Sequence, residues 1–233
     1  MAHRKKANKA APRRKLNTYV NLPPWLKLKL GPLLRKAESK ESFFHRIEQI
    51  WPRTSTQYVL IERAYDDAQR QFRFVIRDNG DQYFEHLRAS ALIAIVHLRV
   101  RDPNIIAAIL LHDIIEDFRE EWTFDRIASR FNKEVAELVY WVTKPEPGGE
   151  LSTKDDALRK YHRQLRLAPR EALLVKLPER MHNLITIWED DEPKTKRKVA
   201  ETRDFHLPLA EDHCILVHEI EDILREIEKR FES

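Results

Sequence analysis

The sequence predicts an all-α fold, a single helical bundle, and three observations support that prediction. The 233 residues include only four glycines, whereas Leu, Ala, Glu, Arg and Lys, which favour helices, are abundant. From about residue 41 onward, apolar residues recur with the helical period. No stretch alternates apolar and polar residues for long enough to form a convincing strand, and FRFVIR comes nearest. With 42% hydrophobic residues, the chain has enough apolar side chains for a substantial core.

We expect two parts in the chain, a basic extension at residues 1–40 and a helical domain at residues 41–233. The extension contains twelve Lys or Arg and one acid, a net charge of +11; since the whole chain carries +4, residues 41–233 carry −7. Residues 1–15 are predicted to form a flexible basic arm, which is a solvated tail, a weak binder of nucleic acid or acidic partners, or a transit peptide. The following stretch VNLPPWLKLKLGPLLRK is predicted to add a short amphipathic piece that docks on the domain.

Cysteine content and hydropathy narrow the class of protein. The single cysteine, Cys214, excludes an intramolecular disulfide and suits a reducing compartment, so we expect a cytoplasmic protein. No run of eighteen apolar residues occurs, so the sequence predicts no membrane span.

Helices are expected one after another along the domain. Asp102 followed by Pro103 is a typical helix start, and Thr123 is a plausible cap for the helix that begins with FDRIASRF. The loop at 144–152, KPEPGGELS, interrupts regular structure because it combines two prolines and two glycines. The last helix either packs within the chain or supports a dimer, so the oligomeric state stays open. The expected helices lie near residues 41–51, 55–72, 84–99, 103–117, 123–130, 132–143, 153–167, 169–188, 193–205 and 207–231.

The segment LLHDIIEDF at residues 110–118 places four ionisable side chains within an apolar run. In a continuous helix His112 and Glu116 lie four residues apart, as do Asp113 and Asp117, so the four side chains form one polar cluster. Burying such groups is costly unless they are paired or bound to a metal. A neutral histidine with carboxylates suits Mn²⁺ or Zn²⁺, and the remaining carboxylates could accept a proton from an attacking water. Local ion pairs on a helix face are the alternative interpretation.

Several blocks of the sequence together resemble one family. HDIIEDF is similar to the H-D-x-x-E-D motif of the RelA/SpoT-type alarmone hydrolases, a branch of the HD-domain metal phosphohydrolases. RDNGDQYFEHLRASALIAIV resembles the family's block with an Arg nine residues before the first metal-binding His, and FNKEVAELVYWVTK resembles the segment after the motif. ALLVKLPERMHNLITI is similar to the block K-L-A-D-R-L-H-N-M-R-T, and ETRDFHLPLAED to the closing E-T-x-x-x-x-x-P-L-A. Because these blocks keep the family's order, the resemblance is more specific than any one motif.

The resemblance implies roles for nine residues, in three groups. The metal ligands would be His86, His112, Asp113 and Glu179, and Mn²⁺ is the expected ion. The acidic pair Glu116 and Asp117 would position the attacking water and accept its proton, and Arg77, Asn183 and Thr186 would contact a nucleotide substrate. Two other side chains are expected to be structural, Arg180 as an ion-pair partner and His182 as a buried or exposed histidine without a role in the site.

This chain departs from the family pattern at three positions that bear on the site. Glu179 stands where the family has an Asp, and the extra methylene moves the carboxylate by about one bond length, which matters for a metal ligand. Asp78 replaces a residue that is often basic, and Ile185 replaces an Arg. Both changes remove positive charge near a phosphorylated substrate.

The implied reaction is metal-dependent removal of the 3′-pyrophosphate from ppGpp or pppGpp, which yields GDP or GTP and pyrophosphate. The length leaves no room for the further domains of long family members, so the chain resembles a stand-alone small alarmone hydrolase with a basic extension. Two alternatives are an HD phosphohydrolase of another nucleotide, such as ppApp or NADPH, and a catalytically decayed protein that binds nucleotide or RNA.

Overall fold

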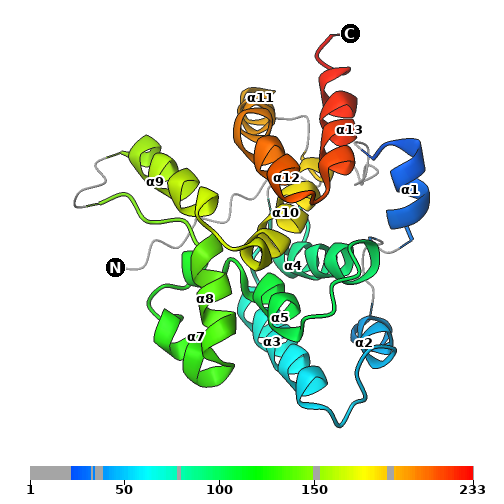
Figure 1. Ribbon diagram of the computed structural model, residues 1–233, viewed down its shortest axis with the longest axis vertical. Helices are drawn as coiled ribbons and strands as arrows, with labels where there is room; N and C mark the ends of the chain where they lie inside the picture. Colours follow the sequence, from blue (N-terminus) through cyan, green and yellow to red (C-terminus); the bar gives the residue numbers. More distant parts are fainter. Residues whose placement is uncertain are drawn as a thin grey trace.

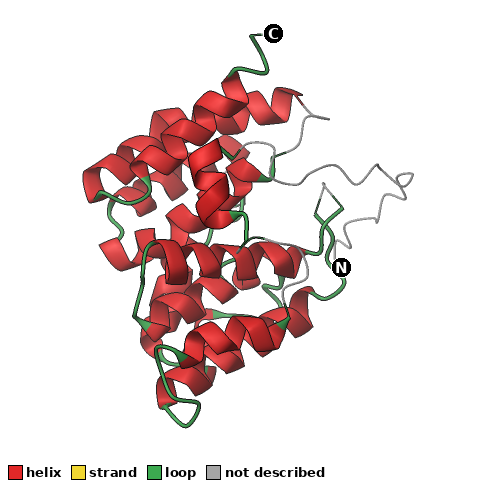
Figure 2. Ribbon diagram, turned by 90° about the vertical axis from the view of Figure 1, so that its right-hand side faces the viewer, coloured by secondary structure: helices red, strands yellow, loops and turns green. Residues whose placement is uncertain are grey.

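The computed structural model describes residues 22–32, 34, 39–77, 80–148, 153–187 and 192–232, and these residues form helices joined by turns and loops (Figures 1 and 2). The described part of the chain contains no strand; an isolated antiparallel bridge joins Ile76 to Gln82. The all-α prediction is therefore confirmed. The elements are α1 (Pro24–Leu30), α2 (Lys40–Glu48), α3 (Thr56–Phe72), α4 (Tyr83–Leu92), η1 (Ile93–His97, π-helical), α5 (Pro103–Leu111), α6 (Ile114–Asp117), α7 (Phe124–Arg130), α8 (Lys133–Val142), α9 (Lys154–Arg166), α10 (Arg170–Ile185), α11 (Glu192–Glu201), η2 (Thr202–His206, π-helical), α12 (Leu207–His213) and α13 (Val217–Glu228).

The core forms around α5 and α10. Helix α5 packs against α3, α4, α8 and α10, while α10 also contacts α13. All residues from Ile105 to Leu111 are buried, as expected of a helix that is apolar on every side. The Asp102 carboxylate accepts a hydrogen bond from the Asn104 backbone, and the Thr123 hydroxyl accepts one from Arg126, so both predicted caps are confirmed. In Figure 1, α10 lies between the α3–α5 layer and the layer formed by α11, α12 and α13.

The predicted amphipathic piece before residue 41 is present as helix α1. Its Leu26 and Leu30 are buried, while Leu28 on the other side is exposed. The Trp25 indole donates a hydrogen bond of 2.9 Å to Asp222 of α13, so the first described helix is attached to the last one. Residues 1–15, predicted to be a flexible arm, lie outside the described residues. Among the described helices, none has the length and apolar character needed to cross a membrane.

Two of the expected helices are wrong because the chain breaks within them. The helix predicted at 103–117 ends at Leu111, and α6 starts only after a turn at His112 and Asp113. The helix predicted at 207–231 is divided into α12 and α13, because Cys214 and Leu216 adopt left-handed backbone conformations with φ of 54° and 57°. Neither residue is a glycine or asparagine, so the sequence carries no ordinary signal for this break. The single long C-terminal helix considered for a dimer is therefore absent.

Candidate active site

The turn between α5 and α6 determines how His112 is presented. His112 Nδ1 lies 2.7 Å from the Ile109 carbonyl oxygen, which requires Nδ1 to donate and leaves a lone pair on Nε2. His112 is buried, and Nε2 has no hydrogen-bond partner among the described residues. A buried nitrogen without a partner is costly unless something else binds it. The ring is therefore arranged as a metal ligand would be, with its tautomer fixed by the backbone.

His86 of α4 and Glu179 of α10 meet His112 at one point. One ligand atom from each of the three side chains lies within 4.8 Å of the others, and all three are buried. The ring centroids of His86 and His112 are 5.3 Å apart. Nitrogen and carboxylate oxygen are the donors that divalent transition metals accept, so the donor set fits a metal ion. Three of the four predicted ligands are thus brought together, from α4, α10 and the turn after α5.

Asp113, the fourth predicted ligand, lies beside this cluster. Its Oδ2 atom is 3.1 Å from His112 Nε2 and accepts a hydrogen bond from the Tyr83 hydroxyl. Burial works to raise the pKa of Asp113, but the charge of His112 outweighs it and holds this pKa well below its usual value. Conversely, Asp113 outweighs the effect of burial on His112 and raises the pKa of that ring. The ring and the carboxylate thus face each other across a position that suits a proton or a metal ion.

A chain of hydrogen bonds connects the three predicted substrate-binding residues to Glu179. Arg77 donates to the Asn183 amide oxygen at 2.5 Å and to the Thr186 hydroxyl at 3.1 Å, although these residues lie more than a hundred positions away. The Asn183 amide in turn donates to Glu179. Arg77, Asn183 and Thr186 therefore form one cluster, which adjoins the candidate metal ligands.

Two side chains of the site have partners that the sequence did not indicate. His182, expected to have no role, is buried, and its Nδ1 lies 2.7 Å from Nδ1 of His86. Tyr83 bonds Asp113 and stacks on Phe72 at a ring distance of 5.0 Å, which fixes its position. Burial and the proximity of Arg77 hold the pKa values of His86 and His182 well below their usual value, so both rings are neutral. Neutral imidazole is the form that binds a metal.

The two residues of the predicted acidic pair differ: Glu116 is anchored by Lys144, and Asp117 is exposed. The Glu116 carboxylate accepts a hydrogen bond of 2.7 Å from the Lys144 backbone and lies 3.5 Å from the Lys144 ammonium group. Asp117, at the end of α6, is exposed. The pair therefore borders the site from the α6 side, and Lys144 holds its Glu116 carboxylate in place.

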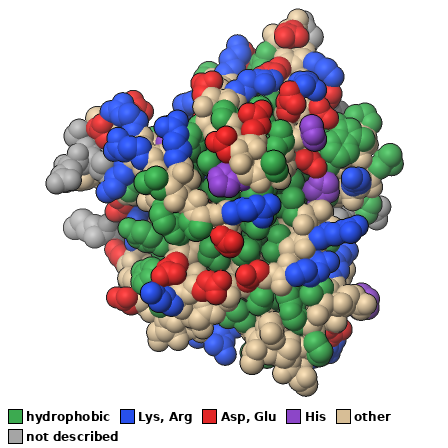
Figure 3. Space-filling model, in the orientation of Figure 1, with side chains coloured by type: hydrophobic (Ala, Val, Ile, Leu, Met, Phe, Trp, Pro, Cys, Tyr) green, Lys and Arg blue, Asp and Glu red, His purple; other side chains and the backbone are tan. Residues whose placement is uncertain are grey.

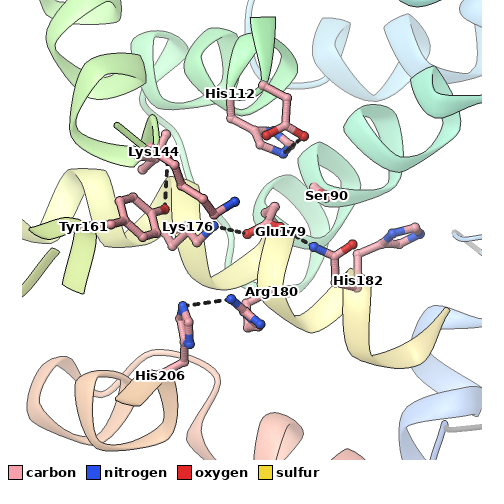
Figure 4. A network of polar contacts seen from close by, with 12 residues as sticks. Ser90, His112, Lys144, Tyr161, Lys176, Glu179, Arg180, His182 and His206 are labelled. Atoms are coloured by element: carbon pink, nitrogen blue, oxygen red, sulfur yellow. Dashed lines mark hydrogen bonds and ion pairs between the residues drawn. The ribbon is translucent and has the colours of Figure 1, made fainter. Parts of the chain in front are cut away.

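Glu179 is held by a second cation, Lys176. The Lys176 ammonium group is buried and forms an ion pair of 2.7 Å with Glu179 Oε2 (Figure 4). The angles of this contact are not those of a hydrogen bond, so Oε2 has no hydrogen-bond partner among the described residues. The ring of Tyr161 contacts both lysines of the site, with Lys176 Nζ 5.3 Å and Lys144 Nζ 5.6 Å from its centroid. Burial alone would raise the pKa of Glu179, but Lys176 and Arg180 hold it well below its usual value. Glu179 is therefore an ionised carboxylate despite its burial.

Arg180, expected to be structural, points away from the cluster. Its guanidinium donates to both oxygens of Glu201 at 3.1 and 3.2 Å and lies 3.2 Å from His206 Nε2. Figure 4 shows Arg180 and His206 facing each other across α10 from Lys176. Lys198, on the helix that carries Glu201, is half-buried, and burial together with Arg180 lowers its pKa to about 8.

Comparison with known proteins agrees with this geometry. The sequence pattern of the HD domain matches residues 64–215, which is more than half of the chain. The chain belongs to the HD domain family. This HD domain is 37% identical over 153 residues to the guanosine-3′,5′-bis(diphosphate) 3′-pyrophosphohydrolase of Aquifex aeolicus, a match that covers 64% of the chain and 21% of that relative. It is 37% identical over 155 residues to the GTP pyrophosphokinase rsh of Brucella melitensis, covering 65% of the chain and 20% of the relative.

A more distant relative and a solved structure extend the comparison. Identity is 28% over 193 residues with the probable guanosine-3′,5′-bis(diphosphate) 3′-pyrophosphohydrolase of a Synechocystis strain, covering 82% of the chain and 24% of that relative. This HD domain therefore spans between 20% and 24% of the length of these three relatives. A solved structure described as a metazoan ortholog of SpoT that hydrolyzes ppGpp matches with a TM-score of 0.63 at 20% identity, covering 76% of this chain and 97% of that one. This structural match confirms the fold.

The HD domain family is metal-dependent, and the residues of this chain fit a metal ion. His112 Nε2 is buried without a hydrogen-bond partner in the described structure, and Glu179 is an ionised carboxylate facing two histidines. A divalent cation would satisfy the nitrogen and balance the carboxylate at the same time. The candidate metal centre is thus supported by the side chains themselves as well as by the family.

Proposed function

We propose that this HD domain hydrolyses the 3′-pyrophosphate of the alarmone ppGpp or pppGpp to give GDP or GTP and pyrophosphate. The observation that carries the proposal is the series of hydrogen bonds from Arg77 through Asn183 to Glu179, because it connects an arginine to a cluster whose side chains fit a metal ion. The names of the Aquifex and Synechocystis relatives support this substrate.

In this proposal, His86, His112, Asp113 and Glu179 hold one divalent ion, for which we propose Mn²⁺. When bound, such an ion supplies positive charge that polarises the scissile phosphate and favours ionisation of water. Lys176 and Asn183 keep the Glu179 carboxylate directed at the two histidines, and the Ile109 carbonyl keeps His112 in the ligating tautomer.

The remaining residues of the site bind the substrate and move the proton. Arg77, with Asn183 and Thr186, binds the nucleotide and balances its phosphate charge. Glu116 or Asp117 accepts the proton of the attacking water. The oxygen of that water forms a bond to phosphorus while the bond between phosphorus and the 3′ oxygen breaks. Lys144 orients Glu116, and Lys198 adds positive charge from α11. The 3′ oxygen takes up a proton and leaves as the hydroxyl of GDP or GTP.

The experiment that tests the proposal is product analysis after incubation of the full chain with ppGpp, in Mn²⁺ and in EDTA. We expect GDP and pyrophosphate in Mn²⁺ only. The double variant Glu116→Gln/Asp117→Asn is the control for contaminating hydrolases and should yield no product. Intact ppGpp in a sample shown to bind Mn²⁺ would contradict the substrate assignment.

One observation favours a second substrate class. Ile185, which stands where the family has an Arg, is buried with 1% of its surface exposed, so it offers no charge to a substrate. Asp78, the other changed position, lies outside the described residues. A nucleotide with a different phosphate arrangement, such as ppApp or NADPH, is therefore the alternative, and both belong in the same assay.

Glu179→Asp tests whether the site has instead decayed. The shorter side chain restores the family residue, so an enzyme that works with Glu179 should stay similar or improve, whereas a decayed site should gain activity that the natural chain lacks. Activity that appears only in Glu179→Asp would favour the nucleotide-binding or RNA-binding interpretation. Deleting residues 1–15 should spare catalysis by an enzyme and abolish partner binding by such a protein.

A further inference from the structure

A groove lies apart from the candidate active site, between α2 and the segment that follows η1. Its volume is about 530 Å³, and its walls include Arg46 of α2, Arg99 and Arg101, with Ile50, Ile95 and Val96 as apolar lining. This volume lies within the range of roughly 300–1,000 Å³ that is usual for small-molecule sites. His86 occupies the first turns of α4, whereas the groove lies beyond the other end of that helix, so the two sites are separate.

Among the described residues that line the groove, the charged ones are all arginines. Within the same part of the chain, neither Arg99 nor Arg101 forms an ion pair. In Figure 3, Lys and Arg side chains gather at the right of the molecule, over the end of α4 and the region of α2. A concave surface that carries positive charge concentrates anions, because its low-dielectric walls focus the field.

Two of the guanidinium groups are held in place by the protein. Arg46 Nη1 donates to the Ser42 carbonyl at 2.9 Å. Arg101 Nη1 donates to the carbonyl of Ile95, within η1, at 3.0 Å and to the carbonyl of Val100 at 2.9 Å. Fixed guanidinium groups lose less conformational entropy on binding an anion than mobile lysines do.

Arg99 adopts a backbone conformation that the protein would reach more easily with glycine. Its φ is 54°, in the left-handed region that side chains other than Gly, Asn and Asp rarely adopt. It lies two residues after the end of η1, and π-helical turns are frequent at functional sites. An arginine at such a position points to use of its guanidinium, because the backbone alone would favour glycine.

We propose that this groove binds a nucleoside di- or triphosphate, separately from the catalytic cluster. A guanidinium group matches phosphate oxygens in pairs, so Arg99 and Arg101 together suit a polyphosphate. The apolar side chains of Ile50, Ile95 and Val96 offer a surface for the base and sugar. This site would exist whether or not the chain hydrolyses an alarmone.

Calorimetric titration of GTP into the full chain in EDTA, with Arg77→Ala as the background, tests the proposal. Arg77→Ala removes the proposed nucleotide contact of the active site, so the remaining binding reports the groove. We expect one equivalent of GTP to bind, with pyrophosphate binding more weakly because it lacks the base and sugar. Adding Arg99→Gly should weaken GTP about tenfold or more while thermal unfolding stays equal or rises, since glycine accepts the backbone conformation.

Arg163→Ala in the same background is the matched control. Arg163 is an exposed residue of α9, distant from the groove in Figure 1, and its removal changes the net charge by the same amount. It should leave GTP affinity unchanged. Equal loss in Arg163→Ala and Arg99→Gly would overturn the proposal in favour of unspecific charge attraction. Unchanged affinity in Arg99→Gly, absent binding, or equal affinity for pyrophosphate and GTP would also overturn it. None of these results depends on ppGpp hydrolysis.

Discussion

The candidate metal ligands come from two regions that are built differently. His112 and Asp113 lie in a turn between two helices, whereas Glu179 lies inside the continuous helix α10. His112 is oriented by one backbone carbonyl, and its ligating nitrogen has no hydrogen-bond partner among the described residues but lies 3.1 Å from Asp113 Oδ2. Glu179 is bound through side chains, to Lys176 on one side and Asn183 on the other.

This difference weights function against stability. The ligating nitrogen of His112 faces only the carboxylate of its neighbour Asp113, at 3.1 Å, so replacing His112 removes a ligand at a modest cost to the folded structure. Replacing a buried side chain that neutralises another buried charge leaves that charge unpaired. We therefore expect variants of the turn to lose mainly metal binding and activity, and variants of α10 to lose more stability.

The largest effect should come from the turn. In His112→Gln we expect a loss of activity on the order of a thousandfold, because an ion that stabilises transition-state charge by several kcal/mol would lose a ligand. The thermal unfolding midpoint without metal should fall less than it does in Glu179→Ala, since only the contact with Asp113 is lost. Product formation from ppGpp and calorimetric Mn²⁺ binding measure the two effects. His162→Gln, at a half-buried ring outside the cluster, is the control; a His112→Gln protein that still bound Mn²⁺ normally would remove His112 from the ligand set.

Breaking the ion pair in α10 should mainly cost stability. Glu179→Ala leaves the buried Lys176 without its counter-charge, and we expect a loss of about 3–5 kcal/mol in the free energy of unfolding. The double variant Glu179→Ala/Lys176→Met should recover most of this loss, since both charges are gone. Urea denaturation in EDTA measures all variants of the cycle. If the double variant were as unstable as the single one, the pair would not explain the stability.

His112 in the turn and three other buried histidines should respond to acid in opposite directions. The pKa values of His86, His182 and His206 are held well below normal by burial, so the unfolded chain binds more protons than the folded one below about pH 6.5. Each ring thus lowers stability by about 1.4 kcal/mol per pH unit as the pH falls through that range. The raised pKa of His112 has the opposite sign: its contribution is complete below pH 6.5 and is lost as the pH rises through the folded pKa.

Urea denaturation in EDTA at pH 7.5 and pH 5.5 tests this balance. The natural chain should be less stable at pH 5.5, because three rings of one sign outweigh one of the other. His112→Gln should increase the difference, and His206→Gln should reduce it. A natural chain that gained stability on acidification would show that the buried rings accept protons in the folded state.

The smallest effect on stability should come from Tyr161, whose ring contacts both lysines of the site. Tyr161 contacts Lys144, which holds Glu116, and Lys176, which holds Glu179. Tyr161→Phe keeps the ring and removes only the hydrogen bond to the Val142 carbonyl, so we expect a loss of about 1 kcal/mol with kcat unchanged. Tyr161→Leu should lower kcat as well, whereas Tyr65→Leu, at another buried tyrosine, should lower stability only. Equal kcat in Tyr161→Leu and Tyr65→Leu would limit Tyr161 to packing.

Much of the site follows from the sequence because the motif blocks carry spatial information. Arg77 and Asn183 are far apart in the chain, yet the resemblance placed both at a nucleotide site, and the structure joins them by a hydrogen bond. The local sequence pattern did not predict those features of the structure that tertiary contacts determine. The apolar period continues through residues 103–117, so it gives no sign of the turn at His112. The sequence did not predict roles for Tyr83 and His182, because their partners, Asp113 and His86, come from distant parts of the chain.

The hydrogen-bonded series of Arg77, Asn183 and Glu179 has a thermodynamic consequence. A nucleotide that engages Arg77 alters the donor to Asn183, and hence the group that holds the metal-ligating carboxylate. When two ligands act on one such series, their binding free energies are coupled, and the coupling is reciprocal. By whatever factor a nucleotide changes the affinity for the ion, the ion changes the affinity for the nucleotide by the same factor. Saturation with either one therefore sets the concentration range over which the other is sensed.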